Sequence, residues 1–584
     1  MNQTEINTAA GLSLSGFPHM DDSSLETVSR GLGLSMSTAE LRTCRTYYRN
    51  SLRRDPRAEE LLLLDRMIES GSRSPACLCV TEMKTDSKLV ADIFADLMAR
   101  RPSVVSDLER PSSLLELIGL MESYLASSDE RPNPLSNVAV RFTFHRDLLL
   151  TSEGFLITAS TGSGDEDISI GVKPSQRAFN GGAVKPGDYV YALLDTKNPD
   201  DEFEKRLTQY LLENAVKQAT KSVRLIGNGG LLEALMQLAD GLTLNTKSLM
   251  RDADFDLPKL ADPVFGVLLV ASPTASADIL LLAQEMGLHI IRAATVTADN
   301  EIRIPAKNGG FFTFHSSFLR SLTLPRAYSA IVATPANTLP EIALTRIGTC
   351  TLNGQKHAVV KVDASGDNPF AASLFGTLYA FLYCVVAGAR PSEVGLACHL
   401  TLPRPSSGRM GESLAMILGL YRMQAEFELY GNTPTLEAGT DEHPALSIAT
   451  IAHLPEHLTP STVVGSGSKI FYLEPLYTAD GIPDFADLKK MLGYIEKLNR
   501  DGHVLSMLPT SGDLLSDLEK MSRNTTVEYV RRQPFTSRFG GLLVETDVTI
   551  QGALVAVTET EPKAKAEPKP ESEEAPAEAL PATE

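Results

Sequence analysis

The chain of 584 residues is too long for one hydrophobic core and predicts about three to five domains. Its 43% hydrophobic and 22% charged residues are typical of a globular protein, and six cysteines in so long a chain exclude a disulfide framework. The net charge of −19 argues against a surface that binds nucleic acid, because such a surface needs clustered Lys and Arg.

No feature of the sequence indicates a membrane or secretion. We expect no run of about 18 apolar residues of the kind that crosses a bilayer. The first residues (MNQTEINTAAG) lack the basic and then apolar layout of a signal peptide. The sequence therefore predicts a cytoplasmic protein.

The N-terminal part predicts a short helical unit after a weakly ordered start. Residues 1–30 show little pattern, whereas residues 31–75 show helical periodicity. Asp55 suits an N-cap and Pro56 suits the first helical position, so a helix is expected to begin there. Its broad apolar face consists of Leu61, Leu62, Leu63, Leu64, Met67 and Ile68.

The next two regions predict mixed α/β structure. In residues 76–178, helical stretches alternate with the strand-like NVAVRFTFH. Residues 179–308 begin with a turn (FNGGAVKPGD) and a buried strand (YVYALLD), and continue with helices and strands around the glycine-rich turn IGNGG. Alternation of strands and helices indicates a mixed module with helices packed on a sheet.

The second half of the chain repeats this plan. SKIFYLEPL corresponds to YVYALLD, and after each of these strands come a long helix, a short strand, a glycine-containing turn and another helix. The repeat predicts two large modules, with the second one in residues 309–558. Residues 559–584 are rich in Pro, Ala, Glu and Lys and have almost nothing to bury, so they predict a disordered tail.

Four segments, in this order, resemble phosphoribosylformylglycinamidine synthase, the purine-pathway synthetase of the AIR synthase superfamily. They are residues 37–65, 227–245, 411–440 and 484–524. The resemblance is to the long, single-chain bacterial form and runs from about residue 35 to about residue 555. It implies an α+β fold of two tandem AIR-synthase-like modules, built from mixed sheets with helices.

The resemblance also implies a division into domains, in which the first N-terminal-type domain is reduced and the second C-terminal-type domain is truncated. The glutaminase domain of the long family form is expected to be missing. The expected parts are a weakly ordered N-terminus at 1–30, a helical linker-like unit at 31–75, the reduced N-terminal-type domain at 76–178, a C-terminal-type domain at 179–308, a second N-terminal-type domain at 309–478, the truncated C-terminal-type domain at 479–558 and the tail at 559–584.

In the family, ATP phosphorylates the amide oxygen of formylglycinamide ribonucleotide, and ammonia from glutamine displaces phosphate. This chemistry needs carboxylates for Mg²⁺, a histidine or cation near the developing charge, and donors for phosphate. At the family's W-S-x-H-C-x-H stretch this chain has residues 68–74, where the two histidine positions are Gly71 and Ser74. In the family's N-D-F-G-A-G-G turn the aspartate position is Leu225, which cannot bind Mg²⁺.

Three further family motifs are replaced. S-E-S-Q-E-R-M becomes ADPVFGV at 261–267, G-G-K-D-S-M-S-G becomes GNTPTLEAGT at 431–440, and the later G-A-G-G becomes PTSGD at 509–513. No cysteine lies in the context of a nucleophile elbow. The sequence therefore predicts that the folding pattern persists without any catalytic residue.

Two remnants could still bind a ligand. Backbone N–H groups of Gly227, Gly229 and Gly230 at a helix start could hold a phosphate, although tight packing explains the same glycines. Asp363 and Asp367, in a loop before a helix, are the carboxylate pair best suited to Mg²⁺, with turn and capping roles as the alternative.

The function that the sequence predicts is that of a non-catalytic homologue of the synthetase, acting as a scaffold or regulator. Its partner would be a second copy of the chain or a purine-pathway synthetase, and we expect no nucleic-acid or membrane partner. Two alternatives stay open: an ATP-dependent carbon–nitrogen ligase acting on formylglycinamide ribonucleotide, and a nucleotide-binding sensor. ATP and Mg²⁺ are the expected cofactors if any site survives. His315 and His399 are isolated in the sequence and are expected to be partly buried polar residues.

Overall fold

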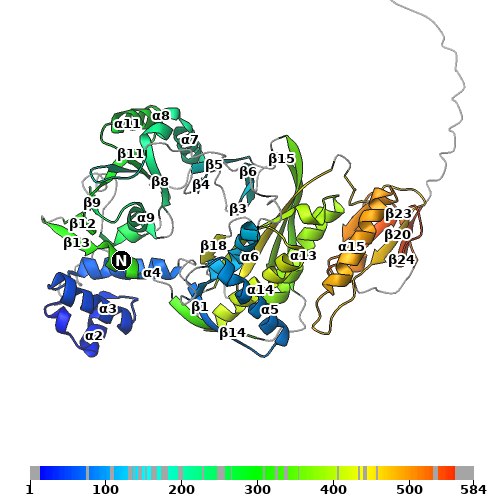
Figure 1. The fold of residues 1–584 in the computed structure, drawn as a ribbon, viewed down its shortest axis with the longest axis horizontal. Coiled ribbons are helices and arrows are strands. Elements are labelled where there is room, and N and C mark those ends of the chain that lie inside the picture. The colour runs from blue at the N-terminus through cyan, green and yellow to red at the C-terminus, as the bar shows by residue number, and fades with distance from the viewer. Residues whose placement is uncertain are drawn as a thin grey trace, which may run out of the picture. The chain divides into compact units, whose positions relative to one another are not determined.

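The computed structural model divides into two compact units, which are residues 1–458 with 478–482 and residues 459–477 with 483–584. Figure 1 shows the helices and strands of each unit. The residues that the structure describes are 14–73, 78–105, 111–128, 135, 138–142, 148–151, 154–159, 168–172, 182–194, 201–226, 229–245, 257–262, 264, 266–306, 310–322, 326–333, 340–352, 354–403, 407–431, 435–438, 443–455, 458–530 and 537–559.

Residues 14–52 fold as a helical unit, so the weak order that we expected up to residue 30 is wrong for its described part. The unit contains the 3₁₀ turn η1 (Phe17–His19), α2 (Asp22–Leu32), α3 (Thr38–Tyr47) and the π-helical turn η2 (Tyr48–Leu52). Apolar residues are sparse along this stretch, yet Phe17, Leu25 and Tyr48 are fully buried in one cluster. Convergence in space supplies the core that the sequence pattern did not show.

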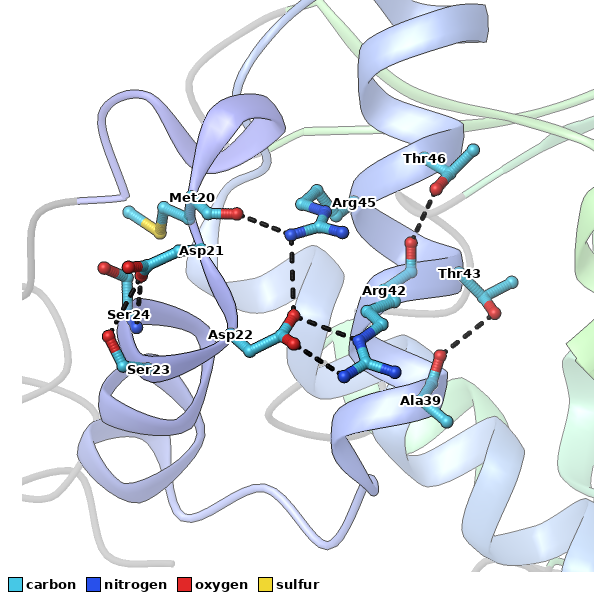
Figure 2. Close-up of polar contacts among 10 residues, drawn as sticks. All are labelled: Met20, Asp21, Asp22, Ser23, Ser24, Ala39, Arg42, Thr43, Arg45 and Thr46. Carbon is cyan, nitrogen blue, oxygen red and sulfur yellow. Dashed lines mark hydrogen bonds and ion pairs between the residues drawn. The ribbon is translucent and has the colours of Figure 1, made fainter.

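Polar contacts fix α2 against α3. Arg42 donates to both carboxylate oxygens of Asp22, at 3.0 and 2.6 Å, and Arg45 donates to the carbonyl oxygen of Met20 at 2.6 Å (Figure 2). Asp21 caps α2 by accepting a hydrogen bond from the N–H of Ser24 at 2.9 Å. Because the Arg42–Asp22 pair is about half exposed, we attribute most of the stability of this unit to the buried apolar side chains.

The helix predicted near Asp55 and Pro56 is present as α4 (Ala58–Arg73), but it begins later than expected. Glu60 is fully buried, makes a 2.5 Å ion pair with Arg54, and accepts a hydrogen bond from the N–H of Arg57 at 2.8 Å. These contacts set the helix start after Arg57. Most of the predicted apolar face is buried, namely Leu61, Leu63, Leu64, Met67 and Ile68.

The largest sheet of the first unit has the strand order β13-β12-β9-β11-β7-β10-β8. Its strands are β7 (Tyr189–Leu194), β8 (Thr220–Ile226), β9 (Leu242–Leu244), β10 (Gly266–Ala271), β11 (Ile290–Val296), β12 (Glu301–Pro305) and β13 (Phe311–His315). On β7, Val190 and Ala192 enter one apolar cluster while Tyr191 and Leu193 enter another, so both faces of this sheet are covered.

Different helices cover the two faces. α7 (Asp201–Leu212), α8 (Asn214–Ala219) and α11 (Ser276–Glu285) bury residues in the cluster of Tyr191, and Figure 1 shows them together above the sheet. The other face receives α9 (Gly230–Leu238), the 3₁₀ turn η5 (Leu257–Ala261), α12 (Ser316–Leu322) and the N-terminal helices. Because β13 pairs with β12, this domain extends past the boundary at residue 308 that we expected.

A second sheet in the first unit has the order β15-β16-β19-β17-β18. The strands are β15 (Glu341–Leu352), β16 (Gln355–Ser365), β17 (Val394–Leu402), β18 (Thr435–Ala438) and β19 (Ala445–His453). α13 (Pro369–Val386) packs on β16 and β19, and it contacts α14 (Ser407–Phe427).

The opposite face of this sheet is covered by strands from much earlier in the chain. β3 (Val138–Phe142), β4 (Leu148–Thr151), β5 (Gly154–Ala159) and β6 (Ile168–Val172) form a sheet of their own, and Val138, Val140, Phe142 and Ile170 share an apolar cluster with Val359 and Ile451.

The two expected modules are also joined by strand pairing. β1 (Leu78–Thr85) pairs in parallel with β14 (Arg326–Val332), and the short β2 (Ser112–Ser113) lies on its other side. α5 (Lys88–Arg100) and α6 (Leu114–Ser128) contact α14 next to this sheet. Residues from both halves of the chain therefore share one core.

One helix contradicts our expectation about apolar runs. α13 is 18 residues long, with a mean hydropathy of 1.7, and by length and composition it could cross a membrane. However, 94% of that window is buried inside the structure. Burial between a sheet and α14 accounts for its composition, as in a core helix.

The second unit is a five-stranded sheet in the order β21-β23-β20-β24-β22, with two helices. Its elements are β20 (Lys469–Leu473), α15 (Phe485–Arg500), β21 (Val504–Pro509), α16 (Leu514–Met521), β22 (Val527–Tyr529), β23 (Leu542–Thr546) and β24 (Ala553–Thr558). This unit begins earlier than the boundary at 479 that we expected, because β20 pairs with β23 and β24. The expected tail lies outside the described residues from 560 onward.

Candidate functional site

The predicted phosphate turn joins β8 to α9. Gly227 lies outside the described residues, whereas Gly229 is the N-cap of α9 and Gly230 is its first residue. Gly230 has a φ of +68°, which is the left-handed region that favours glycine. The structure describes two glycines of this turn. One of them, Gly230, has the backbone geometry that favours glycine, as the sequence predicted.

Packing explains why Gly230 has no side chain. A Cβ atom at this position would lie 2.5 Å from the carbonyl oxygen of Asp262 and 2.7 Å from that of Leu260. The start of α9 is thus pressed against the backbone of η5 and the residue that follows it. The tight-packing interpretation, which the sequence left open beside phosphate binding, accounts for this glycine.

Glu233 occupies the space next to Gly229. A Cβ atom at Gly229 would lie 1.3 Å from Oε2 of Glu233, so the carboxylate folds back over the turn that precedes its own helix. Burial raises the pKa of this carboxyl group above its ordinary value. The Glu233 carboxyl group therefore lies beside the turn at the start of its own helix.

In the second module, a carboxylate from the helix that follows the corresponding turn also lies against that turn. Asp517, like Glu233, is the fourth residue of its helix, and it is fully buried. Its two carboxylate oxygens accept hydrogen bonds from the N–H and the hydroxyl of Ser511, at 2.6 and 2.8 Å, and Lys520 lies 3.2 Å away. The chain's own carboxylate therefore binds the turn at 509–513.

A cation also lies close to the first turn. Arg224 is on β8 opposite Leu268 of β10, two residues before the strand ends. Its Nε is buried and makes no hydrogen bond within the described part of the chain. This unsatisfied donor is the feature of the site that best fits an anionic ligand.

The two predicted metal ligands lie in different structural settings. Asp363 lies on β16 rather than in a loop, and Asp367 follows the strand in the turn before α13. Lys361, whose side chain is only 2% exposed, makes a 2.8 Å ion pair with Asp363. The N-cap of α13 is neither aspartate but Asn368, which accepts a hydrogen bond from the N–H of Ala371 at 3.1 Å.

Asp363 belongs instead to a polar row across three strands. Ser447 on β19 lies opposite Asp363 and donates a 2.5 Å hydrogen bond to it, and His399 on β17 lies opposite Ser447. The His399 ring stacks at 6.1 Å on Phe142. His399 is therefore not isolated in the structure. No local pattern pointed to Ser447, because it is 84 residues from Asp363 in the sequence.

His315, the other histidine considered from the sequence, also has close neighbours. Its backbone N–H donates to the hydroxyl of Tyr47 at 2.9 Å, and the two rings meet edge to face at 5.9 Å. Within the described part of the chain, no group of three or more His, Cys, Asp or Glu side chains is placed to hold a metal ion. Neither histidine is thus assembled with carboxylates into a metal centre there.

The thiols of the buried cysteines are poorly reactive. Burial raises the pKa of the thiols of Cys44, Cys384 and Cys398 to about 12, so they stay protonated at neutral pH. A thiol in that state is a poor nucleophile. Cys384 and Cys398 are core residues.

Several replaced motif positions give little further information. Gly71 lies within α4, while Ser74 is outside the described residues. The stretch at 431–440 is described only at Gly431 and in β18. The side chains at Gly71, Ser74 and Leu225 supply neither imidazole nor carboxylate.

Comparison with known proteins gives a fold and no family assignment. No family model matches the chain, and no curated protein sequence matches it. PurL of Thermotoga maritima complexed with ADP matches 88% of this chain and 99% of that chain, with a TM-score of 0.53 and 15% identity.

Two other complexes of that protein give similar results. PurL complexed with FGAR matches 67% of this chain and 75% of that chain at a TM-score of 0.51, and PurL complexed with ATP matches 67% and 73% at 0.50, both with 15% identity. At this level of identity the likeness concerns the fold. The chain therefore has the PurL-like, AIR-synthase fold that its resemblance to phosphoribosylformylglycinamidine synthase implied.

Proposed function

We propose that this chain is a non-catalytic relative of phosphoribosylformylglycinamidine synthase that acts as a scaffold or regulator. The fold supports the relationship. The loss of activity is supported above all by Glu233, whose carboxylate lies against the glycine turn where a nucleotide phosphate would have to approach. The Glu233 side chain takes up space beside the turn and, when ionised, repels a phosphate there.

Further residues support the same proposal. Asp517 binds the equivalent turn in the second module, and Lys361 neutralises Asp363. The motif positions of the family carry Gly71 and Leu225 where the reaction needs a histidine and an aspartate. We also propose that the domain division expected from the sequence applies, with the adjusted boundaries near residues 322 and 459.

Thermal unfolding of the full-length protein tests the proposal. It would be recorded alone and with millimolar Mg-ATP, Mg-ADP or formylglycinamide ribonucleotide, and we expect no shift with any of the three. A ligand present at about 100 times its dissociation constant would add about 2.7 kcal/mol of stability, which is easily measured. A clear shift would contradict a closed turn.

A turnover assay separates binding from catalysis. The protein would be incubated with Mg-ATP, formylglycinamide ribonucleotide and ammonia, with an active synthetase as the positive control. We expect no ADP or amidine product above the uncatalysed background. Product formed in proportion to protein would instead establish the ATP-dependent carbon–nitrogen ligase.

Arg224 favours a second candidate function, a nucleotide-binding sensor without turnover. Its buried, unsatisfied Nε lies on the strand that leads into the glycine turn. If the sensor is correct, Mg-ADP raises the unfolding temperature of the wild type and Arg224→Leu removes that rise. If the scaffold is correct, neither protein responds to nucleotide.

The proposed role also includes a partner and a location. We propose that the chain associates with a second copy or with a purine-pathway synthetase in the cytoplasm. Light scattering after size-exclusion chromatography would show a mass of twice 63.1 kDa for a homodimer. Co-elution with an added synthetase would establish the second kind of partner, and a monomer that binds no synthetase would contradict both.

A further inference from the structure

Two histidines face each other at one end of the five-stranded sheet of the first unit. His357 on β16 is the direct cross-strand partner of His453 on β19. The two imidazole rings lie 5.7 Å apart, with an angle of 85° between their planes. Side chains of directly opposed residues leave the sheet on the same face with their Cβ atoms about 5 Å apart.

The hydrogen bond of His357 orients its ring as a metal ligand. Nδ1 lies 3.1 Å from the carbonyl oxygen of Gln355, and a carbonyl only accepts, so Nδ1 carries a proton and donates it. In the neutral ring the lone pair is then on Nε2. Metal-binding histidines usually donate their second ring N–H to a carbonyl or carboxylate in this way.

The separation of the rings suits bidentate binding. With metal–nitrogen bonds of about 2.1 Å and a tetrahedral angle, two imidazole ring centres lie about 5 Å apart. The observed 5.7 Å is slightly wider, and His453 is exposed at the end of its strand, so its side chain has room to rotate. Binding one common ion would require the side-chain torsions of His453 to rotate.

Three other histidines of the described residues are engaged differently. His399 stacks on Phe142, His315 packs on Tyr47, and His503 lies 3.1 Å from Asp547. Cys350 on β15 is the cross-strand partner of His357 on its other side. Since no three such side chains of the described residues converge on one point, water would complete the coordination and Cys350 would not be required.

From these contacts we propose that His357 and His453 form a binding site for a divalent transition-metal cation such as Zn²⁺ or Ni²⁺. Imidazole nitrogen suits these borderline ions better than it suits Mg²⁺ or Ca²⁺. A bound ion would link β16 to β19 at the end of the sheet. The site is separate from the glycine turn and from Asp363, so it does not depend on the proposed function.

Isothermal titration calorimetry of the full-length chain tests this site. The protein would be treated with a chelator, purified without a histidine tag, and titrated with ZnCl₂ and separately with NiCl₂ at pH 7.5. We expect one site per chain for each metal, and at least a tenfold weaker affinity for His357→Gln and for His453→Gln. Titration with MgCl₂ should give no binding at this site.

Two control variants make the result specific. His289→Gln removes an exposed histidine elsewhere in the first unit, and Cys350→Ser removes the neighbouring thiol; both should keep wild-type affinity. Circular dichroism of each variant checks folding, and because His453 is exposed its variant remains informative even if His357→Gln is unstable. The proposal is overturned if the wild type binds neither metal, if both pair variants bind normally, or if Cys350→Ser loses the site.

Discussion

At the scale of single residues, the carboxylates decide how this molecule is interpreted. Glu233 is partly buried at the start of α9 with its oxygen against Gly229, and burial raises its pKa. When the sequence is compared with the family's turn motif, Gly229 corresponds to a glycine of that motif. The comparison gives no reason to consider Glu233. The chemistry of the turn depends on both residues, because Gly229 leaves space beside the backbone and the Glu233 side chain occupies that space.

The raised pKa of Glu233 gives a pH-dependent prediction. The folded state favours the protonated carboxyl, so its contribution to stability is complete below the ordinary pKa of 4.5 and is lost as the pH rises through the folded-state value. Glu233→Gln has no charge to desolvate. We therefore expect the variant to unfold at a higher temperature than the wild type at pH 8.

The size of that difference identifies its cause. The gap between variant and wild type should shrink steadily from pH 8 to pH 4, as followed by thermal melts in matched buffers. Glu285→Gln on α11, where the side chain is exposed, is the control and should leave the melting curve unchanged. A gap that stays constant with pH would show that packing rather than charge separates the two proteins.

At the scale of secondary-structure elements, the approach of α9 to η5 fixes the shape of the turn. Gly230 combines a left-handed backbone with neighbouring carbonyl oxygens at distances that no Cβ tolerates. The same glycine in a family motif is often taken as a sign of ligand binding. Here its structural role is sufficient, because the helix cannot come this close with any other residue.

A pair of glycine substitutions tests that role. Gly230→Ala should lower the free energy of unfolding by about 2–4 kcal/mol, because it adds backbone strain and a clash with the backbone of η5. Gly493→Ala is the matched control, since this glycine lies within α15 with open space around its Cα. It should stabilise the protein by about 0.5–1 kcal/mol.

Chemical denaturation with urea measures both variants. If Gly230→Ala costs as little as an ordinary surface change, below about 0.5 kcal/mol, then the close packing of α9 on η5 is not what requires a glycine. That result would favour the interpretation that the glycines of this turn bind a phosphate.

At the scale of the whole molecule, the chain consists of two compact units with separate cores. The second unit carries an unusual internal contact, because Glu545 on β23 is fully buried and accepts hydrogen bonds from two hydroxyls and two backbone amides. The donors are the N–H groups of Val464 and Gly465 and the hydroxyls of Ser468 and Ser506. These bonds tie the segment that begins the unit to its sheet.

Calorimetry of the full-length chain tests the division into units. We expect two unfolding transitions, and we expect Glu545→Ala to lower only one of them, by at least about 2 kcal/mol, because two buried hydroxyls and two part-buried backbone amides lose their acceptor. Glu496→Ala on α15 removes an exposed carboxylate paired with Arg500 and should shift that transition by less than about 0.5 kcal/mol. One transition that moves as a whole would show that the two units unfold together.

Long, strongly patterned stretches were predictable from the sequence. The apolar face of α4, the turn before β7 and the helix–strand–turn–helix order of both modules follow from local periodicity and from glycine and proline positions. Boundaries were less predictable. The helix α4 begins after Arg57 because of contacts to Glu60, and the second unit begins near residue 459 because of strand pairing.

The sequence by itself indicated mixed helices and strands through local periodicity, and its resemblance to the synthase implied the α+β fold, because both follow from the order of residues along the chain. Tertiary structure alone decided which side chains meet. Lys361 and Ser447 converge on Asp363, Glu233 folds over Gly229, and residues 14–30 acquire a core. Such contacts join residues on different strands or reflect the direction of a side chain, and no local pattern in the sequence records either.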